Sequence, residues 1–268
     1  MANCGNEVVR VRDLCVRFGD KVVLDGLNMT VCEGENYVLM GKSGCGKSVL
    51  LKCILRLLTP DSGDIFLWGK NIATLSDDEM NALKMKISYV FQDGALLSYF
   101  TVAGNVGLSL RENTNLSDEE IDRIVNEKLR WVNLEGTQNL HTSELSGGMR
   151  KRVSIARALA IEPKLIFYDE PTTGMDPPLS DTLDQLIYSL NQKLHNTSIT
   201  VTHDPVAAFY FGDRFGMIHE GKMLFEGTQE QLQDCNDETV IGFITRRLHH
   251  DDPRKYFITG QRGRPGKP

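Results

Sequence analysis

The sequence predicts an α/β fold with a mainly parallel sheet in its core and antiparallel strands near the N-terminus. Short apolar runs typical of buried strands occur at residues 37–40, 164–168 and 198–202. Segments with apolar residues at helical spacing separate these runs, and strands that alternate with helices usually form a parallel sheet. A glycine-rich loop joins the first run to a helix, which indicates a site at the carboxyl end of a strand.

The composition is that of an ordinary globular protein in water. Of its 268 residues, 41% are hydrophobic and 25% are charged, and the formal net charge is −6, so bulk charge does not hold this chain to nucleic acid. No stretch approaches the roughly 18 apolar residues of a membrane-spanning helix. Charged residues (Glu7, Arg10) also stand where a signal peptide would be apolar, and the six cysteines form no CxxC pair. We therefore expect a cytoplasmic protein with reduced thiols.

Strands are predicted on both sides of the glycine-rich loop. Residues 8–23 contain two β-type runs that break at Gly19 and Asp20, and residues 64–68 return to strand-like composition. Between them, a helix is predicted by apolar residues at helical spacing that stop before Pro60. These residues are Leu50, Ile54, Leu57 and Leu58.

The middle third of the chain is predicted to be helical. Residues 76–79 and 117–120 both match the capping box, in which a hydroxyl and a carboxylate satisfy the first free amides of a helix. A later helix carries apolar residues from Leu183 to Leu194. We expect residues 93–159 to form an α-helical subdomain inserted into the α/β domain.

Residues 41–48 fit the phosphate-loop pattern G-x-x-x-x-G-K-[ST], directly after one predicted strand and directly before a helix. The glycines allow backbone amides to surround a phosphate chain at a helix N-terminus, where the helix dipole favours anions. Lys47 is expected to contact the β- and γ-phosphates, and the hydroxyl of Ser48 is expected to bind Mg²⁺. The predicted phosphate site comprises Gly41, Lys42, Ser43, Gly44, Cys45, Gly46, Lys47 and Ser48.

Two adjacent carboxylates, Asp169 and Glu170, end the apolar run at residues 165–168. In a phosphate-loop fold, an acid at this place holds Mg²⁺, which makes Asp169 a candidate metal-binding residue. Glu170 is then the candidate that orients and polarises the attacking water. A pair of acids at a strand end is common on its own, and only the phosphate loop gives this pair a function.

The segment Glu144-Leu-Ser146-Gly-Gly-Met149 resembles the signature of ATP-binding-cassette (ABC) ATPases, which commonly have Gln in place of Met149. The resemblance covers residues 6–245 and implies a P-loop (RecA-like) nucleotide-binding domain over residues 1–245, with ATP and Mg²⁺ as ligands. It also implies roles for four residues elsewhere in the chain. These are Phe18 stacking on adenine, Gln92 as a catalytic and Mg²⁺-binding residue of the Q-loop, Asp176 in the D-loop and His203 as the catalytic switch histidine.

Partners follow from the same resemblance. ABC ATPases hydrolyse ATP between two such domains arranged head to tail, so Ser146, Gly147 and Gly148 would cap the γ-phosphate held by a second copy of the chain. A chain without a membrane span powers transport only by docking onto an integral membrane permease, and the family receives it just after Gln92. Tyr99 and Phe100 are the candidates for this contact.

Met149 and its neighbours, with the segment at residues 46–52, resemble the Mla/Mce group of lipid-transport ATPases. That group implies a permease, an MCE-domain lipid-binding protein, and phospholipid transport between bacterial membranes. The chain would then lie peripherally on the cytoplasmic face of the inner membrane. Two alternatives remain open: the ATPase of another solute importer, such as one for amino acids, and a soluble ABC ATPase outside transport.

Two further segments raise separate hypotheses. Lys47 and the helix dipole are expected to favour the thiolate of Cys45, although an inert small side chain is an equal alternative. Residues 246–268 hold seven Lys or Arg and two Asp, a net charge of +5, with several Gly and Pro. We expect a basic, flexible extension that is either simply solvated or binds the partner ATPase or anionic lipid.

Overall fold

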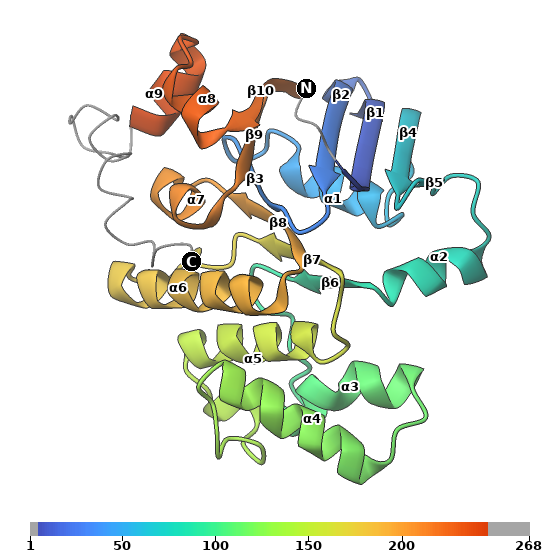
Figure 1. Ribbon diagram of the computed structural model, residues 1–268, viewed down its shortest axis with the longest axis vertical. Coiled ribbons are helices and arrows are strands. Elements are labelled where there is room, and N and C mark those ends of the chain that lie inside the picture. The colour runs from blue at the N-terminus through green and yellow to red at the C-terminus, as the bar shows by residue number, and fades with distance from the viewer. Residues whose placement is uncertain (1–4, 246–268) are drawn as a thin grey trace. The chain divides into compact units, whose positions relative to one another are not determined.

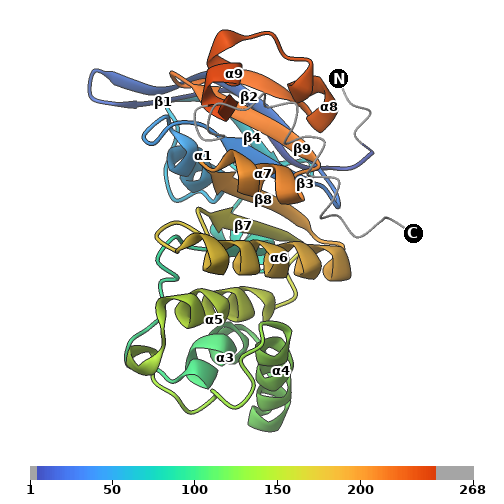
Figure 2. The same cartoon turned by 90° about the vertical axis from the view of Figure 1, so that its left-hand side faces the viewer.

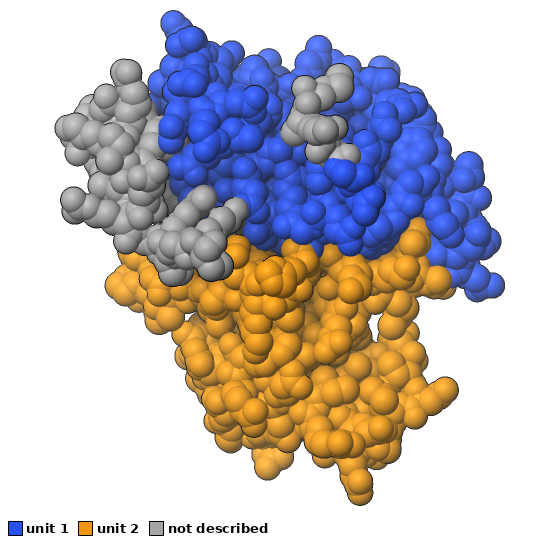
Figure 3. All heavy atoms as spheres, viewed as in Figure 1, with its two compact units in different colours: residues 1–80, 197–268 blue, residues 81–196 orange. Residues whose placement is uncertain are grey.

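The computed structural model describes residues 5–245, so the predicted basic extension at 246–268 lies outside the described residues. The chain divides into two units, which Figure 3 colours separately. Unit 1 comprises residues 1–80 and 197–268, and unit 2 comprises residues 81–196. Helix α2, Asp77–Lys84, carries the chain from unit 1 into unit 2.

Unit 1 begins with an antiparallel sheet, as the sequence predicts. A long hairpin of β1 and β2 turns at Gly19, whose φ of 58° lies in the left-handed region that favours glycine. Val9 and Val11 of β1 are buried, whereas Arg12 and Asp13 are exposed. The sheet has the order β2-β1-β4-β5 (Figure 1). Its strands are β1 Glu7–Phe18, β2 Lys21–Cys32, β4 Ser62–Leu67 and β5 Lys70–Asn71.

The second sheet segment of unit 1 has β3 at its centre. Strand β3, Asn36–Met40, lies parallel to β8, Thr197–Thr202, on one side and to β9, Arg214–His219, on the other. All five residues of β3 and all six of β8 are buried, which explains why these strands are mostly apolar or β-branched rather than alternating. Strand β10, Lys222–Thr228, pairs with β9 in antiparallel fashion. The helices of this unit are α1 Lys47–Ile54, α7 Pro205–Phe211, α8 Gln229–Gln233 and α9 Glu238–Thr245.

Unit 2 combines two parallel strands with a group of helices. Strand β6, Ile87–Val90, pairs with β7, Leu165–Asp169. In both Figure 1 and Figure 2, α5 lies between α6 and the pair formed by α3 and α4. The helices are α3 Val102–Asn113, α4 Asp118–Trp131, α5 Gly147–Leu159 and α6 Pro177–Leu194, with a short 3₁₀ turn at Thr142–Glu144.

One apolar core joins these parts of unit 2. Buried side chains of α3, α4 and α5 pack in a single cluster with Val90 of β6, Ile166 of β7 and Ile187 of α6. The unit at 81–196 is therefore wider than the helical segment expected at 93–159. Burial of apolar area in this shared cluster is the main favourable contribution to its stability.

The two predicted capping boxes are confirmed. The Ser117 hydroxyl accepts from the Glu120 amide at 3.3 Å, while the Glu120 carboxylate accepts from the Ser117 amide at 2.8 Å. Ser76 and Glu79 make the same pair of bonds at 3.3 and 2.9 Å. The bonds from Ser117 lower the pKa of Glu120, because they favour the charged carboxylate.

The expectation that all cysteines are reduced is wrong at Cys32, which is disulfide-bonded. The absence of CxxC pairs from the sequence does not exclude a disulfide bond. The other described cysteines, Cys15, Cys45, Cys53 and Cys235, are free thiols. Among residues 5–245, none of the helices combines the length and apolar character needed to cross a membrane.

Candidate functional site

The loop between β3 and α1 has the backbone conformation that its glycines permit. Gly41, Gly44 and Gly46 have φ values of 151°, 78° and 108°, all in the region that favours glycine. A Cβ atom at Gly41 would lie 2.6 Å from the carbonyl oxygen of Ile218, and one at Gly46 would lie 2.7 Å from Cδ2 of Leu24. Both positions therefore require glycine for space as well as for conformation.

The N-terminus of α1 has no side-chain cap. Its N-cap residue is Gly46, and no side chain accepts a hydrogen bond there. By contrast, side chains of Thr101, Ser117 and Ser146 accept such bonds at the starts of α3, α4 and α5. The N-cap residue of α1 thus supplies no side-chain acceptor, and the backbone of Lys47 in the first turn bonds to the thiol of Cys45 instead, at the positive end of the helix dipole. This arrangement fits an anionic phosphate group.

Lys47 is turned into the same loop. Its Nζ atom donates to the carbonyl oxygens of Gly41 at 2.8 Å and Lys42 at 3.1 Å, and the residue is only 5% exposed. The loop therefore surrounds a buried ammonium group, and a phosphate chain in the loop would replace the carbonyl partners of that cation. This is the charge that a triphosphate requires from a phosphate loop.

The expectation of a thiolate at Cys45 is wrong. Its Sγ atom lies 4.0 Å from Nζ of Lys47, and this cation does favour the thiolate. Burial nevertheless raises the pKa of Cys45 and outweighs the effect of Lys47. Cys45 is therefore a neutral thiol at neutral pH.

Unit 1 also contains three other predicted residues. Phe18 ends β1 and is 53% exposed, as an aromatic side chain that stacks on a ligand must be. Ser48 lies in the first turn of α1, and His203 directly follows the buried strand β8. Phe18, the phosphate loop and His203 therefore belong to one unit.

The two carboxylates lie at the end of β7 in unit 2. Asp169 is the last residue of the strand, and its Oδ2 atom accepts a 2.6 Å hydrogen bond from the hydroxyl of Tyr89 in β6. Burial and this bond to a carboxylate raise the pKa of Tyr89 well above its usual value. Glu170 has a left-handed φ of 46°, and its Oε2 atom accepts a 2.9 Å bond from the hydroxyl of Thr173. The backbone turn and this bond give the Glu170 carboxylate a defined orientation.

The remaining predicted residues of unit 2 lie at the starts of helices and in the loop after β6. Ser146 caps α5 by accepting from the Met149 amide at 3.2 Å, and Gly147 and Gly148 form the first turn. Asp176 caps α6 by accepting from the Leu179 amide at 3.1 Å. The carbonyl oxygen of Gln92 accepts a bond from Lys151 of α5.

Within unit 2, the structure links Gln92 and Glu170 in one hydrogen-bonded group and bonds Asp169 separately to a neighbouring strand, in each case through residues that the sequence analysis missed. These are Tyr89, Lys151 and Thr173, which bond to predicted residues or to their loops. Two of the four bonds end on backbone carbonyl groups, which every residue type possesses. No sequence pattern therefore identifies these contacts.

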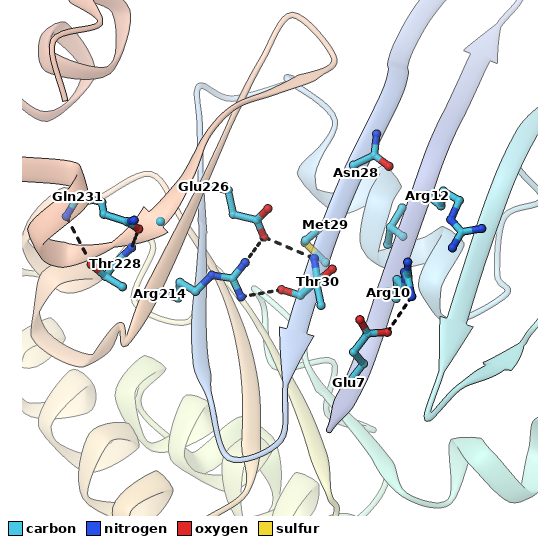
Figure 4. Close-up of a pocket in the computed structure, with 12 residues that line it drawn as sticks. Glu7, Arg10, Arg12, Asn28, Met29, Thr30, Arg214, Glu226, Thr228 and Gln231 are labelled. Atoms are coloured by element: carbon cyan, nitrogen blue, oxygen red, sulfur yellow. Dashed lines mark hydrogen bonds and ion pairs between the residues drawn. The ribbon is translucent and has the colours of Figure 1, made fainter. Parts of the chain in front are cut away.

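A separate cavity of about 790 Å³ lies in unit 1, along β1, β2 and β10 (Figure 4). Four of its charged groups form two ion pairs, Arg214 with Glu226 at 2.6 Å and Arg10 with Glu7 at 3.2 Å. None of the predicted site residues lines it. The predicted phosphate site in the loop after β3 is therefore separate from this cavity.

Comparisons with known proteins agree with this geometry. The family described as ABC transporter matches residues 24–173, which include the phosphate loop, Gln92, the signature and both carboxylates. The chain is 40% identical over 254 residues to the intermembrane phospholipid transport system ATP-binding protein MlaF of Haemophilus influenzae, covering 95% of this chain and 96% of that protein. It is 36% identical over 239 residues to the probable ribonucleotide transport ATP-binding protein mkl of Mycobacterium tuberculosis, covering 89% and 67% respectively.

Solved structures lead to the same family. A dimeric ATP-binding cassette in a post-hydrolysis state, bound to ADP and Pi, is 33% identical and has a TM-score of 0.74. The similarity covers 82% of this chain and 98% of that one. The phosphate loop, the acidic pair and the capped signature helix are thus the parts of a known nucleotide-hydrolysing domain, and the chain belongs to the ABC transporter family as one of its ATPases.

Proposed function

We propose that this ABC ATPase powers the transport of phospholipid or a related lipid between membranes. The observation that carries the proposal is the 40% identity to an intermembrane phospholipid transport ATP-binding protein over nearly the full length of both chains. Met149, in place of the Gln common in this family, points to the same lipid-transport group. The relative named for ribonucleotide transport is somewhat less similar and makes a nucleotide or other small solute the second candidate substrate.

In the proposed site, the groups of unit 1 bind the nucleotide. Lys47 and the amides at the start of α1 hold the phosphates of ATP, and Phe18 stacks on adenine. Ser48 of unit 1 would hold Mg²⁺, and Asp169 and Gln92 are the candidate Mg²⁺-binding residues of unit 2. When bound, Mg²⁺ neutralises negative charge on the phosphates.

Glu170 is the proposed base of the hydrolysis step. Its carboxylate, oriented by Thr173, accepts a hydrogen bond from the attacking water and draws a proton from it. The water oxygen bonds to the γ-phosphorus as the bond from that phosphorus to the bridging oxygen breaks, and ADP and phosphate leave. His203 and Gln92 complete the site by contacting the γ-phosphate and the attacking water. In this role Gln92 uses its side chain, while its backbone carbonyl is bonded to Lys151.

Two copies of the chain form the active species in this proposal. Ser146, Gly147 and Gly148 of one copy contact the γ-phosphate bound by the other copy, and Asp176 lies in the loop near the dimer interface. The N-terminus of α5 directs its helix dipole toward that phosphate from the side opposite α1. Each ATP therefore lies between two positive helix ends.

The surface around Tyr99 is the proposed docking site for a membrane permease. Tyr99 is 73% exposed, and its ring lies 4.7 Å from that of Phe100. The buried side chain of Asn105 holds the preceding loop, because it accepts from the Leu97 amide at 2.8 Å and donates to the Leu97 carbonyl at 3.1 Å. A fixed loop that exposes a large aromatic side chain is suited to bind a helix of a partner protein. Docking there would hold the chain on the cytoplasmic face of the inner membrane.

Affinity purification tests the substrate directly. The Glu170→Gln chain is purified from its native membranes with ATP, and the proteins and lipids bound to it are identified. The matched control is the Lys47→Ala chain, which lacks the cation for ATP. A permease with an MCE-domain protein and phospholipid is the expected result, whereas a permease with a solute-binding protein would support the second candidate. Soluble partners alone would contradict a role in transport.

A further inference from the structure

Lys151 joins three segments of unit 2 that are far apart in the sequence. It lies in the second turn of α5, and its Nζ atom donates to the carbonyl oxygen of Gln92 in the loop after β6. The same Nζ donates to the carbonyl oxygen of Thr173, at 3.3 Å, in the loop after β7. One ammonium group thus connects the helix of the signature to the two loops that carry Gln92 and Glu170.

Charge reinforces this position. Burial lowers the pKa of Lys151, and the carboxylates of Asp93 and Glu170 oppose this effect by favouring the charged form. The Thr173 residue that receives the second bond also donates its hydroxyl to Glu170. Lys151 and Glu170 are therefore linked both through Thr173 and by direct attraction.

The same face of α5 holds the rest of the loop. Arg157 donates to the carbonyl oxygens of Ala95 at 2.7 Å and Gly94 at 2.8 Å. Both of these loop residues have left-handed backbone, with φ values of 45° and 76°, which is unusual for Ala95. Residues 151, 154 and 157 follow at intervals of three along one helix face, and Gly94 lies against Ser154. The loop at 92–95 is consequently attached to α5 at both of its ends.

We propose that Lys151 is a positioning residue that couples the signature of one copy to the hydrolysis residues of the same copy. This inference depends on the proposed head-to-tail dimer. There, the start of α5 contacts the ATP of the partner, while Gln92 and Glu170 act on the ATP of their own copy. A shift of α5 when the partner binds ATP moves Lys151, and with it the loops at 92–95 and 170–173. The two ATP sites are thereby made cooperative through one side chain.

The experiment uses the purified full-length chain and three variants. Lys151→Met removes the ammonium and keeps the length of the side chain, and Lys151→Arg restores a cation with several donors. Arg152→Met is the matched control, because Arg152 lies next on the same helix but donates to the carbonyl oxygen of Val132 instead. For each chain, kcat, KM, the Hill coefficient for ATP hydrolysis and the affinity for a fluorescent ATP analogue are measured.

For Lys151→Met we expect kcat to fall by about 10-fold and the Hill coefficient to fall toward 1, with binding of the analogue within about 2-fold of wild type. Lys151→Arg should recover most of both losses, and Arg152→Met should resemble wild type. An unchanged Hill coefficient in Lys151→Met, or an equal loss in all three variants, would overturn the inference. If the wild-type chain hydrolysed no ATP, the proposed function itself would fail. An active wild type together with a fully active Lys151→Met chain would contradict only the inference about Lys151.

Discussion

The hydroxyl of Tyr89 donates a 2.6 Å hydrogen bond to Asp169 and so joins the ends of two neighbouring parallel strands, β6 and β7. Asp169 is the carboxylate that we propose for Mg²⁺. The bond restricts which Asp169 oxygen faces a ligand, and it comes from a residue with no other proposed role in the reaction. Tyr89 is therefore expected to influence the metal dependence of the enzyme without contacting ATP.

Tyr89→Phe removes this bond and little else. Hydrogen bonds to charged groups contribute roughly 1.5–3 kcal/mol, and less where solvent competes, so we expect about a 3- to 10-fold rise in the Mg²⁺ concentration for half-maximal ATPase activity. Titration of the ATPase rate with Mg²⁺ at fixed ATP measures this. Tyr168→Phe is the matched control, because its hydroxyl bonds to Asn191 instead. The same shift in both variants would contradict a specific role for Tyr89.

Gly41 and Gly44 test the geometry of the phosphate loop. Gly41→Ala places a Cβ atom 2.6 Å from a backbone oxygen, so we expect the free energy of unfolding to fall by about 3 kcal/mol, with loss of ATP binding. In Gly44→Ala the new Cβ atom has no neighbour within 4 Å, and only the left-handed φ of 78° disfavours alanine. We expect the free energy of unfolding to fall by about 1 kcal/mol. Thermal unfolding and ATP binding of both variants check the order. Equal stability of the two would show that the loop is not held as the structure has it.

Cys45 gives a prediction for pH. Because burial raises its pKa above the usual value of 9.0, alkylation by iodoacetamide at neutral pH should be slower than in the unfolded chain. The folded state retains the proton to higher pH than the unfolded state. Its contribution to stability is therefore complete below the unfolded pKa and is lost as pH rises through the folded pKa. Mass spectrometry of the Cys45 peptide across pH 6–11 follows the reaction, and an inflection below about pH 8 would refute the raised pKa.

Tyr99 tests the docking surface. Tyr99→Ser should abolish copurification of the permease while the ATPase rate of the purified chain stays within about 2-fold, because exposed aromatic anchors contribute strongly to binding and little to folding. Leu57→Ser is the control: Leu57 is also exposed, at 63%, but lies in unit 1 just after α1. Retention of the permease by Tyr99→Ser would remove this surface from the proposal.

Several parts of this fold could be predicted from the sequence because a local pattern determines them. The hairpin at Gly19, the buried strand at residues 36–40 and the helix after the Ser117 capping box all have such patterns. The apolar spacing predicts a helix from Leu183 to Leu194. In the structure α6 begins earlier, at Pro177, because Asp176 caps its N-terminus. Strands β9 and β10 were not predicted. A short apolar run such as residues 215–218 does not distinguish a strand from a helix by periodicity, and only pairing with β3 decides it.

The site residues likewise include some that a local sequence pattern predicts and some that it does not. Phosphate chemistry needs particular residue types at a particular spacing, and this requirement predicts residues 41–48, Asp169 and Glu170. Tyr89 and Lys151 could not be predicted in this way. Tyr89 bonds to a carboxylate and Lys151 to two backbone carbonyls, and only folding brings these groups close together. The pKa of Cys45 also depends on burial, which the neighbouring Lys47 alone did not indicate.

The central claim is that each ATP is hydrolysed between Glu170 of one copy and Ser146 of the other. Two variants test it: Glu170→Gln, and Ser146→Asp, which keeps a good cap for α5 but places a negative charge against the γ-phosphate. Each alone should lose at least about 100-fold in turnover, equivalent to roughly 2.7 kcal/mol of barrier. Glu170→Gln should still bind ATP.

Mixing the two inactive chains is the most direct measurement. In a head-to-tail dimer of one chain of each kind, one site carries both changes and the other site is intact. Random mixing makes about half of the dimers mixed, each with one working site of two, so ATPase activity should rise well above that of either variant, to at most about one quarter of the wild-type rate because the two sites are coupled. If each chain used its own Glu170 with its own Ser146, every site would carry a defect. Activity no higher than that of either variant alone would then contradict the account.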